Sequence, residues 1–139
     1  MQRSTLYYTL SIEVVIQNAT KNRYSLPDEK TLRERYVKGI SIRRQNANGD
    51  RETITGNALV SDADLGKCFL SLQADSVNFI DRLPVDFIAI DPDSETIQDR
   101  FVKLDLPNGF DPTKSFIDIS DPSGFTANEA IEITFIYDM

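Results

Sequence analysis

The chain has 139 residues, 40% of them hydrophobic and 27% charged, which is the composition of one globular domain over residues 1–139. Its 15 basic and 22 acidic residues leave a net charge of -7, which disfavours nucleic-acid binding by the surface as a whole. The absence of histidine excludes a His-dependent catalytic triad and a metal site built on imidazole, and the single cysteine, Cys68, excludes an internal disulfide.

The first predicted strand covers residues 6–16, where apolar side chains occupy nearly every second position. This alternation is the period of a strand that buries one face. The following residues, 18–35, predict a long loop with at most one or two turns of helix, because Pro27 suits a first helical position and acidic residues follow it.

Residues 36–45 alternate again and predict a second strand. The Asn48-Gly49 pair that follows is a strong signal for a hairpin turn, which makes residues 51–55 the expected return strand. A short apolar run in residues 56–60 is a further strand candidate.

The second half of the chain carries shorter strand patterns. The candidates are residues 67–73, 77–80, 85–90, 97–106, 115–119 and 130–137. Segments 77–80 and 85–90 form either two strands or one bent strand, because Pro84 between them is tolerated only at a sheet edge or a strand start. Three Asp-Pro pairs and a short turn at residues 61–65 separate the patterns.

About eight or nine strands at this regular spacing are typical of a β-sandwich or barrel. Immunoglobulin-like domains of the antibody type carry a buried tryptophan and a paired disulfide, but this chain has no tryptophan and one cysteine. Long first and last strands suit a jelly roll, in which they can lie side by side. The predicted fold is an all-β, single jelly-roll-like antiparallel β-sandwich of about eight strands.

Charge is unevenly distributed along the chain. Residues 1–51 carry ten basic and five acidic side chains, whereas residues 52–139 carry five basic and seventeen acidic ones. A basic edge of one copy could therefore meet an acidic edge of the next, and head-to-tail contacts of this kind close into rings. An ordinary solvated face is one alternative, and nucleic-acid contact by this basic run is another, less favoured because no stacking aromatic residues are interleaved with it. The candidate subunit-interface residues are Arg33, Arg35, Arg43, Arg44, Asp91 and Asp93.

Motifs that could carry chemistry are short and incomplete. Residues 91–95 resemble the start of a calcium loop but lack its sixth-position glycine, so a solvated acidic turn is expected. Cys68 lies in an alternating run and is expected to be a small buried hydrophobe. We expect no enzymatic activity, no cofactor and no metal. The apolar runs of a signal peptide or a transmembrane helix are missing, which predicts synthesis in a cytoplasm.

One stretch has a recognisable order of residues: Arg23-Tyr24-Ser25-Leu26-Pro27-Asp28, then Leu32-Arg33, then Val37-Lys38-Gly39-Ile40. It resembles a pattern in small jelly-roll structural proteins of tailless icosahedral bacteriophages, where a Tyr-x-hydrophobic-Pro-Asp loop leads through Leu-Arg into a strand. The later Leu83-Pro84 and the segment 114–117 are compatible in order. The specific part of the resemblance covers less than half of the chain.

The resemblance implies a self-assembling bacteriophage structural protein of the virion, with no catalytic residues. Such a subunit is a minor capsid protein or a penton at the capsid vertex, commonly a pentamer beside the major capsid protein, or the base of a spike. The virion membrane is a further neighbour that it allows, and nucleic acid is not an expected partner. The alternatives are a non-catalytic binding module, such as a carbohydrate-binding or fibre-head β-sandwich, and a decoration or tail subunit of a tailed phage.

Overall fold

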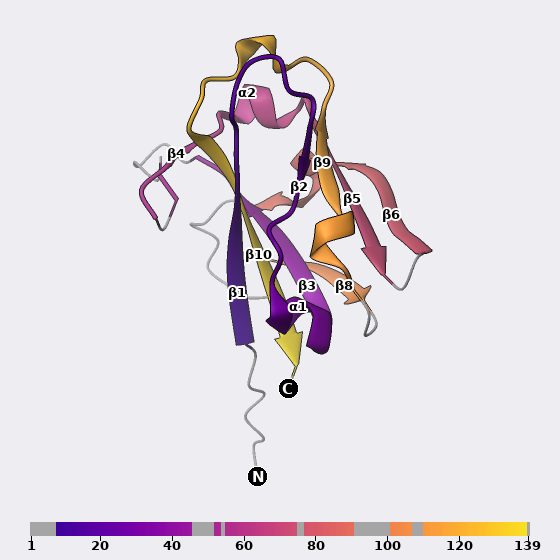
Figure 1. The fold of residues 1–139 in the computed structure, drawn as a ribbon. Helices are drawn as coiled ribbons and strands as arrows, with labels where there is room; N and C mark the ends of the chain where they lie inside the picture. Colours follow the sequence, from indigo (N-terminus) through magenta and orange to yellow (C-terminus); the bar gives the residue numbers. More distant parts are fainter. Residues whose placement is uncertain are drawn as a thin grey trace.

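A computed structural model describes residues 8–45, 52–53, 55–74, 77–90, 101–106 and 110–138 of the chain. These residues form two β-sheets (Figure 1). Sheet A contains β1 (Tyr8–Val15), β10 (Glu129–Asp138), β3 (Tyr36–Arg43), β8 (Val102–Leu106) and the two-residue strands β4 (Ala58–Leu59) and β7 (Ala89–Ile90). Sheet B contains β2 (Arg23–Ser25), β9 (Phe116–Ile119), β5 (Cys68–Ala74) and β6 (Val77–Pro84).

The order of the strands is that of a jelly roll. Sheet A runs β1-β10-β3-β8 and sheet B runs β2-β9-β5-β6, with every pairing in these two rows antiparallel. The chain thus crosses repeatedly between the sheets, as in two nested Greek keys of eight strands. β4 and β7 add short parallel pairings to β10 and β3. The predicted all-β jelly-roll-like sandwich is confirmed, including the pairing of the first strand with the last (Figure 1).

The core lies between the inward faces of the two sheets. Alternation along each strand directs its apolar residues inward, as at Ile12, Ile42 and Phe135 in sheet A and at Leu70 and Ile117 in sheet B. The rings of Phe110 and Phe135 pack with centroids 5.6 Å apart. Burial of such side chains contributes about 1.5–3 kcal/mol each to the stability of the sandwich.

Short helical segments connect the strands. They are the α-helices α1 (Lys30–Glu34) and α2 (Asp62–Leu65) and the 3-10 helices η1 (Val85–Ile88), η3 (Pro112–Lys114) and η4 (Pro122–Gly124). In η3 and η4 the aspartate of an Asp-Pro pair caps the turn, because its side chain accepts a hydrogen bond from the backbone N–H two residues on. None of the helices in the described ranges has the length and apolar character needed to cross a membrane.

The predicted hairpin after residues 36–45 is wrong in its pairing. The Asn48-Gly49 turn lies outside the described residues, but Glu52 forms an isolated bridge with Ala58 rather than with β3. The physical reason is that β10 occupies one edge of β3, while β8 and β7 share the other. No edge of β3 is left for a return strand from residues 52–53 or 55.

Two further predictions need correction. Residues 85–90 are a 3-10 helix followed by the two-residue β7, so β6 continues to Pro84 at the edge of sheet B and then leaves the sheet. The expected loop over residues 18–35 contains the strand β2, which is too short to show a period of its own. Its helix begins at Lys30 and not at Pro27.

Candidate functional site

The predicted basic interface residues do not form one patch. Arg33 lies on α1, where its Nε is 3.3 Å from Asp28 Oδ1, and Arg35 directly precedes β3. Arg43 ends the same strand. At about 3.3 Å of rise per residue, Arg35 and Arg43 are about 26 Å apart along β3. The structure therefore separates the candidates into two groups at opposite ends of the sandwich.

Arg43 and Arg44 each have acidic partners within the chain. Arg43 Nη1 donates to Glu132 Oε2 at 3.0 Å. Arg44 lies with Nε 3.3 Å from Asp62 Oδ1 and Nη2 3.9 Å from Asp86 Oδ1. The acidic candidates Asp91 and Asp93 lie outside the described residues. The predicted intersubunit role of these six residues stays a prediction.

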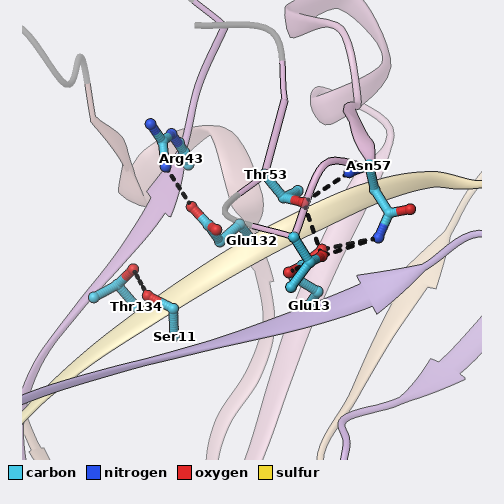
Figure 2. A network of polar contacts seen from close by, with 8 residues as sticks. Ser11, Glu13, Arg43, Thr53, Asn57, Glu132 and Thr134 are labelled. Carbon is cyan, nitrogen blue, oxygen red and sulfur yellow. Dashed lines mark hydrogen bonds and ion pairs between the residues drawn. The ribbon is translucent and has the colours of Figure 1, made fainter.

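The outer face of sheet A carries a network of polar side chains (Figure 2). Ser11 and Thr134 are cross-strand neighbours whose hydroxyl oxygens are 2.8 Å apart. One row further along, Glu13 stands opposite Glu132 in the register of β1 and β10. Glu132 is only 2% exposed, although it lies on the side of the sheet away from the core. The face is therefore covered at Glu132, whereas Ser11 and Val15 on the same side of β1 are exposed.

Glu13 anchors the segment that precedes β4 to the outer face of sheet A. Its carboxylate accepts hydrogen bonds from Thr55 Oγ1 at 2.6 Å and from Asn57 Nδ2 at 3.0 Å (Figure 2). Burial acts to raise the pKa of Glu13, but hydrogen bonds from Thr53, Thr55 and Asn57 outweigh it, so the pKa lies below its ordinary value of 4.5. The ionised form of Glu13 therefore holds the segment in place.

The outer face of sheet B presents a different surface, which we call the arginine face. It consists of Arg23, Phe69, Arg82, Phe116 and Asp118. Arg23 makes a two-pronged contact with Asp118, with Nε 2.7 Å from Oδ1 and Nη2 3.2 Å from Oδ2. Arg82 reaches Asp118 from the other side, with Nη1 3.5 Å from Oδ2. Two guanidinium groups thus converge on one carboxylate.

Each of these guanidinium groups lies over an aromatic ring. The Cζ atom of Arg23 is 4.0 Å from the ring centroid of Phe116, and that of Arg82 is 4.6 Å from the centroid of Phe69. The side chains of Arg23 and Arg82 nevertheless remain 62% and 55% exposed, against 14% for Asp118. The rings support the two guanidinium groups, while more than half of each arginine side chain remains exposed.

A β-bulge in β6 directs Arg82 onto this face. Leu70 pairs with Leu83 and Leu72 pairs with Ile80, so Asp81 and Arg82 together oppose the one residue between Leu70 and Leu72. Arg82 has a φ of 52°, an unusual backbone conformation for a residue other than glycine. Its backbone N–H donates to Ser71 Oγ at 3.1 Å, which stabilises the bulge. Bulges commonly re-aim a side chain in this way.

No cluster of metal-ligating side chains is found in the described part of the chain. It contains no group of three or more His, Cys, Asp or Glu side chains placed to hold a metal ion. Cys68 is fully buried, as expected, and its Sγ is 3.5 Å from the carbonyl oxygen of Asp64. Burial, followed by the negative charges of Asp64 and Asp86, raises the pKa of the thiol to about 12.

The arginine face was not among the residues selected from the sequence. The sequence shows basic residues as a run along the chain between residues 30 and 51, whereas this face is assembled from four separate strands, β2, β5, β6 and β9. The available signal was alternation: Asp118 lies between the buried Ile117 and Ile119, and Arg23 precedes the buried Tyr24. Strand alternation would have placed Arg23 and Asp118 on an outer face, but not beside each other.

The residues of the stretch 23–40 have a structural role. Tyr24, Leu26, Leu32, Val37 and Ile40 are all buried in the core. The Tyr24 hydroxyl accepts a hydrogen bond from the backbone N–H of Gln17 at 3.1 Å, which ties β2 to the preceding loop. The spacing of the stretch is thus the spacing of side chains that anchor β2, α1 and the start of β3 to the core.

Comparisons with known proteins add no relative: no protein family matches the chain, and neither the curated proteins nor the solved structures include a significant match.

Proposed function

We propose that the chain is a non-catalytic structural subunit of a bacteriophage particle, a minor capsid or penton protein that assembles with copies of itself. The observation that carries the proposal is the strand order β1-β10-β3-β8 and β2-β9-β5-β6. Viral capsid proteins share this architecture with lectins and cupins, so the fold alone supports the proposal only by analogy.

The stretch 23–40 favours the capsid alternative among these classes. It resembles small jelly-roll proteins of tailless icosahedral bacteriophages, and its apolar positions are buried where they fix the connection from β2 to β3. The proposed location is the virion, at a capsid vertex, with the major capsid protein as neighbour and a spike or the virion membrane as further contacts. The net charge of -7 makes nucleic acid an unsuitable partner.

The test is the native mass of the purified protein at micromolar concentration, measured by native mass spectrometry and light scattering at low and at moderate salt. A closed ring of about five copies that weakens with salt is the expected result, because charge contacts between copies are screened. A monomer under both conditions would contradict self-sufficient assembly. It would favour a binding module, or a subunit that assembles only on a larger particle.

A further inference from the structure

We propose that the arginine face of sheet B binds an acidic segment of a neighbouring copy of this chain. The inference rests on the proposed function, since it names the surface through which the subunits would assemble. The proposed contact residues are Arg23 and Arg82, and not the basic residues between positions 30 and 51 that the sequence suggested. Arg23 and Arg82 lie on a different sheet from Arg43 and its partner Glu132.

The first argument is that Asp118 occupies only some of the N–H donors of Arg23 and Arg82. Asp118 takes Nε and Nη2 of Arg23 and Nη1 of Arg82. Nη1 of Arg23 and Nη2 of Arg82 form no hydrogen bond with a described residue, and both side chains are more than half exposed. A guanidinium has five N–H donors in a rigid fork that matches a carboxylate. The face therefore offers donors for a second carboxylate beside the one it already holds.

The second argument is preorganisation. Phe116 and Phe69 support the two guanidinium groups, Asp118 aligns them, and the bulge at Arg82 fixes the direction of its side chain. Ordering a long side chain on binding costs about 0.5–1.5 kcal/mol, and here much of that ordering is already present. Arginines and aromatic residues are also the residue types enriched at the centres of protein interfaces.

Charge complementarity identifies the occupant as another copy. Two arginines and one aspartate make the face locally positive, on a chain whose net charge is -7. The acidic surplus lies in residues 52–139, with seventeen acidic and five basic side chains. A second copy thus supplies the opposite charge, and a contact between a basic face and a different, acidic surface is head-to-tail, as ring assembly requires.

The edge of sheet B is less suited to this contact than its face. β6 is the last strand of the sheet and exposes Val77 and Phe79. However, its pairing with β5 shifts register twice, and the exposed Asp81 lies in the bulge. Bulges and charges of this kind protect an edge from pairing with a further strand. Association through the side chains of the face avoids that obstacle.

The experiment compares two triple variants that change the net charge equally. Arg23→Gln/Arg82→Gln/Asp118→Asn neutralises the face without leaving a carboxylate unpaired. The control, Lys30→Gln/Glu34→Gln/Lys103→Gln, removes exposed charges on α1 and on sheet A. Sedimentation velocity over a concentration series gives the self-association constant of each. We expect it to weaken at least about tenfold in the face variant and less than about twofold in the control.

Other results would overturn the inference in distinguishable ways. If the wild type and the face variant assemble equally, or if both triple variants weaken assembly equally, the arginine face is not the contact while the proposed function stands. If the wild type remains monomeric, self-assembly and this contact both fail. Arg23→Lys/Arg82→Lys keeps the charges and the fold, so it provides the test if the face variant does not fold. Full wild-type affinity in that lysine variant would exclude recognition through the guanidinium forks.

Discussion

Arg43 and Arg44 are adjacent in the sequence but should differ sharply in their contribution to stability. Arg43 bonds the 2% exposed Glu132, whereas Arg44 faces Asp62 and Asp86, which are 50% and 46% exposed. Removing one partner of a buried ion pair costs about 3–5 kcal/mol, while an exposed pair contributes about 0–1 kcal/mol. Because the Arg43 side chain is itself 29% exposed, we expect Arg43→Ala to cost about 3 kcal/mol, the lower end of that range.

The expected loss converts into a measurable shift of the melting temperature. At about 2.1 cal/mol/K of unfolding entropy per residue, a chain of 139 residues loses roughly 3 °C for each kcal/mol. Arg43→Ala should therefore melt about 10 °C lower than the wild type, and Arg44→Ala at most about 3 °C lower. Calorimetry gives the melting temperature of each variant, and urea denaturation monitored by circular dichroism gives its free energy of unfolding.

Arg44→Ala is the matched control, because both variants remove one positive charge. Adding Glu132→Gln to Arg43→Ala should recover part of the lost stability, since the buried carboxylate is then neutral. Equal losses in the two single variants, or no recovery in the double variant, would refute the assignment of Arg43 as a group that compensates the burial of Glu132. It also follows that charge reversal at Arg43 would disturb the fold and is no clean test of an interface.

Two further outcomes follow from the titrating groups. Glu13→Gln should cost about 1 kcal/mol at pH 7, because the ionised carboxylate holds Thr55 and Asn57. Since the pKa of Glu13 is lowered in the folded state, its contribution to stability is present above about pH 4.5 and is lost as the pH falls through the folded pKa. In urea denaturation at low pH, the free energies of unfolding of the wild type and Glu13→Gln should therefore converge. A difference that stays constant with pH would contradict the anchoring role. Cys68, with its pKa raised to about 12, should react with a thiol reagent at pH 8 only as the protein unfolds, and rapid labelling of the native protein would disprove its burial.

The fold class was accessible from the sequence because the first and last strands carry a clear physical signature. β1 and β10 each have one face in the core, so an alternation of apolar and polar residues is visible in residues 6–16 and 130–137. Side-by-side packing of the first and last strands also followed from the pattern. In β10 the outward Glu132 and Ile136 are buried as well, so this part of the outer face is covered.

What the sequence could not provide is the pairing between distant segments. The local Asn48-Gly49 signal predicted a neighbour for β3 along the chain, but β10 and β8 occupy its edges in the folded protein. Likewise β2 is three residues long and is held in sheet B by β9, which lies far away in sequence. Local patterns determine which residues can form strands, whereas edge occupancy depends on the whole topology.

The prediction of interface residues failed to find the arginine face for the same reason, because local patterns do not show which distant segments meet. A run of basic residues along the chain suggested one patch, yet the length of β3 separates its two ends, and Arg43 and Arg44 have acidic partners in the folded chain. The arginine face depends on a bulge at Arg82 and on strands that meet only through β5 and β9. Neither feature leaves a periodic signal in a single sequence.

The position of β10 between β1 and β3 also determines when the molecule can acquire its structure. Ser11 and Thr134, whose hydroxyl groups meet across β1 and β10, are separated by 123 positions in the chain. During synthesis, β1 and β3 remain without their shared neighbour until residues 129–138 have emerged, so sheet A can close only after that point. Proteins dominated by such long-range pairings fold slowly, in milliseconds to seconds. Until then the apolar faces of β1 and β3 stay open to solvent, and the nascent chain depends most on protection from aggregation in that interval.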